Sequence, residues 1–307
     1  MFKDIRIALI FSVVLLDIIG IGIIFPIIPD LLKEVGINQT ASAALWGGLL
    51  SSSYAFTQFV FSPTIGTLSD IFGRRPILLL ASLLLGLDYL LMGFAETIFI
   101  LFIGRIIGGL AGGTIATGTA YLADISDTKD KQKNFAIIGA AFGLGFILGP
   151  IIGGLMGEIS VRAPFFLSAL LCFLNFFLCF LLLPETLKLG TKNKFVIRKL
   201  NPFFNISYIF EVPLFKGLFF CFFLIAFANT VYPSIWSFWG REVFGWSSGM
   251  IGFTLACYGL LLFIVQAFVI RLKFFDKLST KRLTLFSLTC GIIALVSFGI
   301  VRVEILV

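Results

Sequence analysis

Residues 5–28 read IRIALIFSVVLLDIIGIGIIFPII, and this run indicates the class of protein before any other feature does. Seventeen of its 24 positions hold Ile, Leu, Val or Phe, each of which favours membrane insertion by about 0.3 to 0.6 kcal/mol near the bilayer centre. Their sum exceeds the cost of about 3 kcal/mol for the single acid, Asp17. The run therefore predicts a transmembrane helix with a carboxyl group inside the membrane.

The composition extends this prediction to the whole chain of 307 residues, of which 59% are hydrophobic and 13% charged. A soluble domain carries about 25% charged residues, so a soluble enzyme, a disordered chain and a disulfide scaffold are excluded. Segments of about 20 apolar residues are long enough to span a bilayer. Nine such segments are predicted as helices: 5–28, 43–65, 76–95, 97–122, 134–157, 164–183, 213–239, 247–270 and 282–301.

The basic residues predict the orientation of these helices. With the N-terminus inside, 18 of the 23 Lys and Arg residues fall on the cytoplasmic side, as the positive-inside rule requires. This rule also accounts for the net charge of +7, since no basic stripe with interleaved aromatic residues suggests nucleic-acid binding. The basic stretch 184–212 is expected to be a cytoplasmic linker between a six-helix half (1–183) and a three-helix segment (213–307).

A repeated loop supports this division. The loop GTLSDIFGRR (66–75) follows the second predicted helix, and a degenerate copy, DKLSTKR (276–282), follows the eighth. A duplicated helical unit is typical of secondary transporters.

Three ionisable residues, Asp17, Asp88 and Arg105, are predicted at similar depth near the bilayer midplane. Charges there are costly, so they should face a cavity or one another. One interpretation is a site for protons and substrate, in which a carboxyl group changes its charge. The other is a buried ion pair that only fixes helix packing. Because the chain has no histidine, any proton-coupled step must use carboxyl groups.

The five cysteines lie in apolar runs without metal-type spacing, so we expect neither a metal site nor disulfides. Three mid-span amides are candidate substrate contacts, although bonds between helices are equally compatible with them. They are Gln58, Asn175 and Asn229.

Small residues mark two helix faces. Arg105 shares a face with Gly108, Gly109, Gly112, Gly113 and Ala116, and the fifth helix carries Gly145, Gly149, Pro150, Gly153 and Gly154. Faces without side-chain bulk allow close helix approach.

The 66–75 loop is predicted to turn tightly at Gly66 and Gly73, with Asp70 at a helix end. Arg74 and Arg75 are expected to pair with Asp124 in a cluster that can stabilise one conformation and release it in another. The alternative is simple positive-inside anchoring. We call Gly66, Asp70, Gly73, Arg74, Arg75 and Asp124 the cytoplasmic latch.

These motifs together resemble the drug/proton antiporters of the major facilitator superfamily, and the tetracycline/proton efflux proteins most of all. The likeness rests on Gly66–Arg75, Arg105-x-x-Gly108-Gly109, Gly145–Gly154 and the first-helix string 16–29, and it extends to about residue 301. It implies that Asp17 and Asp88 are needed for antiport and that Asp70 and Arg74 form a latch. Two family positions differ, because Leu262 stands where a histidine is usual and Gly291 where an acid is usual.

The predicted fold class is an all-α membrane protein with a complete six-helix N-terminal half and three helices of a C-terminal half, without the family's last three helices. The expected function is proton-coupled efflux of a small amphipathic drug or metabolite, or of a metal-tetracycline chelate, across a bacterial inner membrane. The alternatives are a truncated, non-transporting remnant or a module that pairs with another chain. We expect lipid and protons as partners, no cofactor, no nucleic acid and no enzymatic activity.

Overall fold

The computed structural model describes residues 4–127, 130–187, 213–267 and 280–300, and every element of regular structure in those ranges is a helix. In chain order they are α1 (Ile5–Glu34), α2 (Thr40–Phe72), α3 (Arg74–Phe94), α4 (Ile98–Ala111), α5 (Thr114–Ile125), α6 (Lys131–Ile159), α7 (Ala163–Leu182), α9 (Pro213–Phe244), α10 (Ser248–Ala267) and α12 (Thr280–Ile300).

Seven segments of this helical membrane protein are long and apolar enough to cross a bilayer: α1, α3, α4 with α5, α6, α7, α9 and the described part of α10. The prediction of nine spans is therefore supported for seven. Helix α2 is the longest helix within the described ranges, yet it falls outside this group. It carries polar residues such as Ser51, Gln58 and Ser62, which line cavities.

The predicted bounds of the loop at 66–75 are wrong, because the turn in the structure is much shorter. Helix α2 continues to Phe72, so Gly66 and Asp70 lie inside the helix, and no neighbouring atom requires a glycine at position 66. The turn into α3 is made by Gly73 alone, at φ 110°. An L side chain rarely adopts this backbone conformation, so one glycine suffices to reverse the chain.

The fourth predicted span, 97–122, is interrupted. Helix α4 ends at Ala111 and α5 begins at Thr114, with Gly112 and Gly113 in a turn between them. Two adjacent glycines lower helix propensity by roughly 1 kcal/mol each, and this makes them a favoured place for a break.

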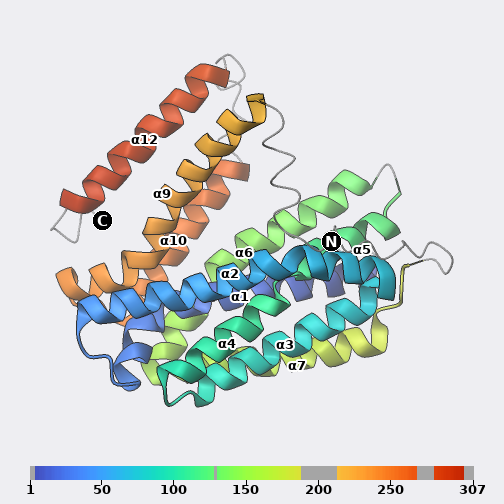
Figure 1. Ribbon diagram of the computed structural model, residues 1–307, viewed down its shortest axis with the longest axis horizontal. Helices are drawn as coiled ribbons and strands as arrows, with labels where there is room; N and C mark the ends of the chain where they lie inside the picture. The colour runs from blue at the N-terminus through green and yellow to red at the C-terminus, as the bar shows by residue number, and fades with distance from the viewer. Residues whose placement is uncertain (1–3, 128–129, 188–212, 268–279, 301–307) are drawn as a thin grey trace.

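Helices α1 to α7 form one bundle, and α9 and α10 contact it at one end and diverge from it toward the other (Figure 1). The prediction of close approach along α6 is confirmed. A Cβ atom added to Gly149 would lie 2.7 Å from the carbonyl oxygen of Ile19 in α1. One added to Gly154 would lie 2.7 Å from the carbonyl oxygen of Ser248 in α10. The glycines of α6 thus allow α1 and α10 to pack closely against two faces of this helix.

Most of the predicted linker (188–212) and much of the repeated loop (276–279) fall outside the described residues. The division into 1–183, 184–212 and 213–307 therefore stays a prediction.

Candidate functional site

An ion pair links α3 and α4 inside the bundle. Nη2 of Arg105 donates to Oδ2 of Asp88 at 2.5 Å, with 5% of Arg105 and none of Asp88 exposed. The glycines of α4 make room for this pair, because a Cβ atom on Gly104 would lie 3.0 Å from Oδ1 of Asp88 and one on Gly108 would overlap Oδ2. The expectation that the intramembrane charges face one another is confirmed for these two residues.

Tyr54 of α2 connects this pair to Asp17, and sequence reasoning missed its role. The guanidinium carbon of Arg105 lies 5.4 Å from the centre of the Tyr54 ring, in the range of a cation–π contact. The Tyr54 hydroxyl lies near Asp17 without meeting hydrogen-bond geometry. A tyrosine among small and polar residues of one helix face was the available signal.

Asp17 is fully buried in α1 and lies outside the ion pair. Its Oδ2 accepts a hydrogen bond from the hydroxyl of Thr114, the first residue of α5, while its Oδ1 has no partner among the described residues. The break between α4 and α5 therefore places a hydroxyl directly against the carboxyl group, although the sequence pattern did not single out Thr114.

Gln58 of α2 forms a hydrogen bond to the turn between α4 and α5. Its Nε2 donates to the carbonyl oxygen of Gly112 at 3.2 Å, and a Cβ atom on Gly112 would overlap the Gln58 amide. A carbonyl group freed by the helix interruption is thus hydrogen-bonded, as a buried carbonyl must be. Gln58 therefore forms the bond between helices that was one interpretation of this residue, and it also lines the cavity described next.

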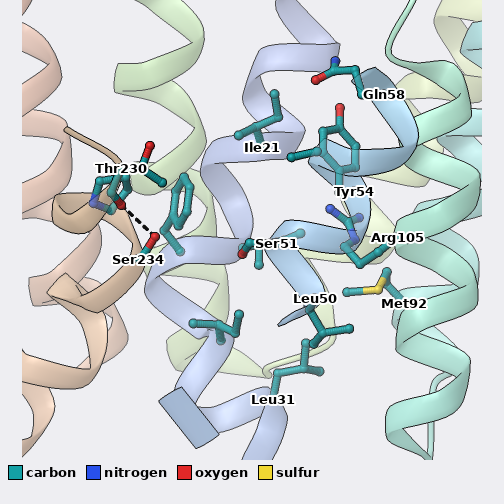
Figure 2. Close-up of a pocket in the computed structure, with 15 residues that line it drawn as sticks. Ile21, Leu31, Leu50, Ser51, Tyr54, Gln58, Met92, Arg105, Thr230 and Ser234 are labelled. Atoms are coloured by element: carbon teal, nitrogen blue, oxygen red, sulfur yellow. Dashed lines mark hydrogen bonds between the residues drawn. The ribbon is translucent and has the colours of Figure 1, made fainter. Parts of the chain in front are cut away.

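A cavity of about 270 Å³ lies between α1, α2, α4 and α9 (Figure 2). Its walls are mostly apolar, which suits an organic ligand. Arg105, Tyr54 and Gln58 contribute polar groups from one side. Thr230 and Ser234 face it from α9, where the Ser234 hydroxyl donates to the Thr230 carbonyl oxygen at 2.7 Å.

The two asparagine candidates lie elsewhere. Asn175 accepts a hydrogen bond from the Ser12 hydroxyl at 2.7 Å, so it joins α7 to α1 and does not line this cavity. Asn229 lines a separate cavity of about 200 Å³ between α1, α6, α9 and α10.

At the turn between α2 and α3, Arg74 forms the predicted pair with Asp124 at 3.3 Å and a second pair with Asp70. It also donates to the Ser69 hydroxyl at 2.6 Å. Arg75 does not share in this cluster, contrary to expectation. Its Nη2 donates to the carbonyl oxygen of Phe180 at 2.6 Å, because the start of α3 directs consecutive side chains to different sides of the helix.

Glu185, just after α7, was not identified as a site residue. Its carboxylate accepts backbone hydrogen bonds from Arg74 (3.0 Å) and Arg75 (3.1 Å), and it fills the space where Gly73 would carry a Cβ atom. The neighbouring Thr186 hydroxyl donates to Asp124 at 3.2 Å. Thr186 therefore joins the end of α7 to Ser69, Asp70, Arg74 and Asp124, and we call these five residues the Arg74 cluster.

The opposite end of the molecule carries a second polar cluster. Arg241 of α9 pairs with Asp30 of α1, and the Ser248 hydroxyl donates to Asp30 at 2.7 Å. The Ser247 hydroxyl donates to Glu158 of α6 at 2.7 Å. We call Asp30, Arg241, Ser248, Ser247 and Glu158 the Asp30 cluster. It joins the α1–α7 bundle to α9 and α10 at the end where they meet.

Within the described ranges, no group of three or more His, Cys, Asp or Glu side chains could hold a metal ion. The five cysteines are free thiols.

Known proteins resemble this chain along nearly its whole length. The sequence profile of the Major Facilitator Superfamily matches residues 10–304. The chain is 38% identical over 260 residues to the tetracycline resistance protein, class C, of Escherichia coli, a match that covers 85% of this chain and 65% of that protein. It is 30% identical over 272 residues to the quinolone resistance protein NorA of Staphylococcus aureus, covering 87% of this chain and 67% of that protein.

The fold agrees with a solved transporter. The crystal structure of the human organic anion transporter MFSD10 matches with a TM-score of 0.68 at 23% identity, covering 87% of this chain and 72% of that one. The chain spans about 65% of the length of relatives such as the class C protein. Because the family profile covers almost every residue and the helical bundle has this architecture, the chain belongs to the Major Facilitator Superfamily.

Proposed function

We propose that this protein exports a small amphipathic drug, of the tetracycline class or similar to it, in exchange for protons. The observation that carries the proposal is the buried polar group formed by Asp17, Asp88 and Arg105 beside an apolar cavity. Ionisable side chains inside a membrane protein are costly, and they typically mark ion or substrate pathways. Relatives named for tetracycline and quinolone resistance support the same assignment.

In this proposal Asp17 carries the transported proton. Among the described residues, its Oδ1 has no hydrogen-bond partner and its Oδ2 has only the Thr114 hydroxyl, so no positive charge there contacts the carboxyl group and keeps it ionised. Asp88 is paired with Arg105 and serves to position that arginine at the cavity wall. Gln58 contacts both the cavity and the break, and it would sense an occupant.

We further propose alternating access between two arrangements of the helices. The Asp30 cluster would close one end in the present arrangement. The α6 surface against which α1 and α10 pack is formed by Gly145, Gly149, Pro150, Gly153 and Gly154. The Arg74 cluster at the opposite end is the proposed cytoplasmic latch. Its network of Asp70, Asp124 and Thr186 would be remade in each cycle.

The proposed topology places the N-terminus and the linker 184–212 in the cytoplasm of a bacterial cell, with six helices before the linker and three after it. The distribution of Lys and Arg supports this orientation. Transported tetracycline, alone or as a metal chelate, would enter from the cytoplasmic side, and protons would return from outside.

Transport in proteoliposomes tests the proposal. The purified chain is reconstituted, a pH gradient is imposed, and radiolabelled tetracycline uptake is measured with and without an ionophore that collapses the gradient. We expect gradient-dependent uptake by the natural chain and its loss in Asp17→Asn. Asp127→Asn is the matched control, because Asp127 is exposed outside the helices. Gradient-independent uptake, or full activity of Asp17→Asn, would contradict the proposed proton role.

A further inference from the structure

A second cavity lies against the first. The 270 Å³ cavity and the 200 Å³ cavity share two wall residues, Phe25 of α1 and Pro233 of α9. The backbone between them is fixed where the Ser237 hydroxyl of α9 donates to the carbonyl oxygen of Phe25. The two cavities therefore adjoin each other at Phe25 and Pro233.

The two cavities differ in chemistry. The first is lined by Arg105 and Tyr54, and among the described residues the buried Nε of Arg105 has no hydrogen-bond partner. Buried donors of this kind favour a ligand that offers acceptor oxygens, because an unmade hydrogen bond in an apolar environment is costly.

The second cavity is mainly aromatic and aliphatic. Tyr232 and Tyr258 line it with their rings stacked, 5.4 Å between centroids and 15° between planes. Among the described residues that line it, Asn229 is the one with a side-chain amide. A surface of this kind favours an aromatic ring, which gains offset stacking in addition to apolar burial.

Neither cavity alone reaches the size of roughly 300 to 1,000 Å³ that is usual for drug-sized ligands, whereas the two joined enclose about 470 Å³. We propose that they form one two-part binding site for an elongated aromatic molecule with acceptor oxygens at one end, and that Phe25 determines the length of ligand admitted. The acceptor end lies toward Arg105 and Tyr54, and the distal ring lies against Tyr232 and Tyr258. This inference rests on the proposed export function, since it describes the ligand of the same site.

The test compares two aromatic acids that differ by one ring, benzoate and 4-phenylbenzoate, bound by the purified full chain in detergent. Quenching of tryptophan fluorescence reports the binding, because Trp236 stacks on Tyr232. We expect 4-phenylbenzoate to bind about tenfold more tightly than benzoate. Tyr258→Leu should weaken 4-phenylbenzoate about fivefold and leave benzoate within twofold. Tyr258→Phe keeps the ring and should leave both affinities within twofold.

Phe25 gives the second arm of the test. Phe25→Ala should join the two spaces and strengthen 4-phenylbenzoate about threefold or more, while the affinity for benzoate stays within twofold. Equal affinity for both acids in the natural chain, or a Tyr258→Leu loss equal for both, would overturn the two-part site. An unchanged preference in Phe25→Ala would overturn its role as the length determinant.

These outcomes separate this inference from the export proposal. Binding is measured without a pH gradient, and we expect Asp17→Asn to bind 4-phenylbenzoate while it fails to transport. Binding with the predicted length preference but without any transport would leave the two-part site standing and reject the export function. Gradient-driven transport by a chain without the length preference would do the reverse.

Discussion

Replacement of Glu185 by alanine should loosen the start of α3. The first backbone N–H groups of a helix lack intrahelical partners. In α3 the Glu185 carboxylate accepts those of Arg74 and Arg75, at 3.0 and 3.1 Å, and the third position is Pro76, which has no N–H. One side chain from the end of α7 therefore satisfies the donors that this turn would otherwise leave unpaired.

The magnitude follows from these contacts. Loss of a capping acceptor typically costs about 1 kcal/mol, and loss of a negative charge at a helix N-terminus adds about 0.3 to 1 kcal/mol. Because Glu185 is exposed, the charge contribution belongs at the lower end of that range. A total near 1.4 kcal/mol corresponds to about a tenfold increase in the local opening constant.

Hydrogen exchange followed by mass spectrometry measures that opening. We expect peptides covering the first turn of α3 to exchange about tenfold faster in Glu185→Ala, with the middle of α3 unchanged. Glu185→Gln is the matched control, because it keeps one acceptor oxygen but loses the charge, and its effect should be intermediate. Unchanged exchange in Glu185→Ala, or an equal increase along the whole helix, would refute the capping role.

Three further outcomes test other parts of the structure. Gly153→Ala should lower the melting temperature in detergent by overpacking α6 against α1, at a cost of about 1 to 3 kcal/mol, whereas Gly139→Ala, where nothing lies within 4 Å, should not. Asp30→Asn should widen the distance distribution between spin labels on α1 and α9, and exchanging the charges of Asp30 and Arg241 should narrow it again; no widening would exclude a closing role. The hydrogen bond from the Arg6 side chain holds the pKa of Asp4 below its usual range. Capping of α1 by the Asp4 carboxylate should therefore be complete above about pH 4 and lost as the pH falls through the lowered pKa, with no such pH dependence in Asp4→Asn.

Part of the site could be predicted from sequence because a charged side chain inside the membrane must pair with another group or face a cavity. An acid and an arginine at one depth in neighbouring spans must find partners, and the pair Asp88–Arg105 follows from that requirement. The same reasoning placed Arg74 opposite Asp124, since both lie at the same end of the bundle. The glycines of α6 predicted close packing, because a helix without side-chain bulk has few other uses in a bundle.

Other features depend on contacts between distant residues, and no local pattern indicates them. Gly66 is a residue typical of turns, yet it lies in a helix, since α2 continues to Phe72. Gln58 reaches across helices to the break at Gly112, and Glu185 reaches from α7 to the start of α3. For Gln58 and Glu185 the deciding partner is more than 50 positions away in the sequence.

The sequence alone thus determined that the chain is a helical membrane protein with carboxyl groups inside it, because hydropathy and the cost of buried charge act residue by residue. Only the tertiary structure decided that Asp17 bonds to Thr114 rather than to Arg105 and that Asp30 pairs with Arg241. It also placed Phe25 between two cavities. These arrangements arise from how whole helices pack, and the packing depends on the shapes of all their contacting faces together.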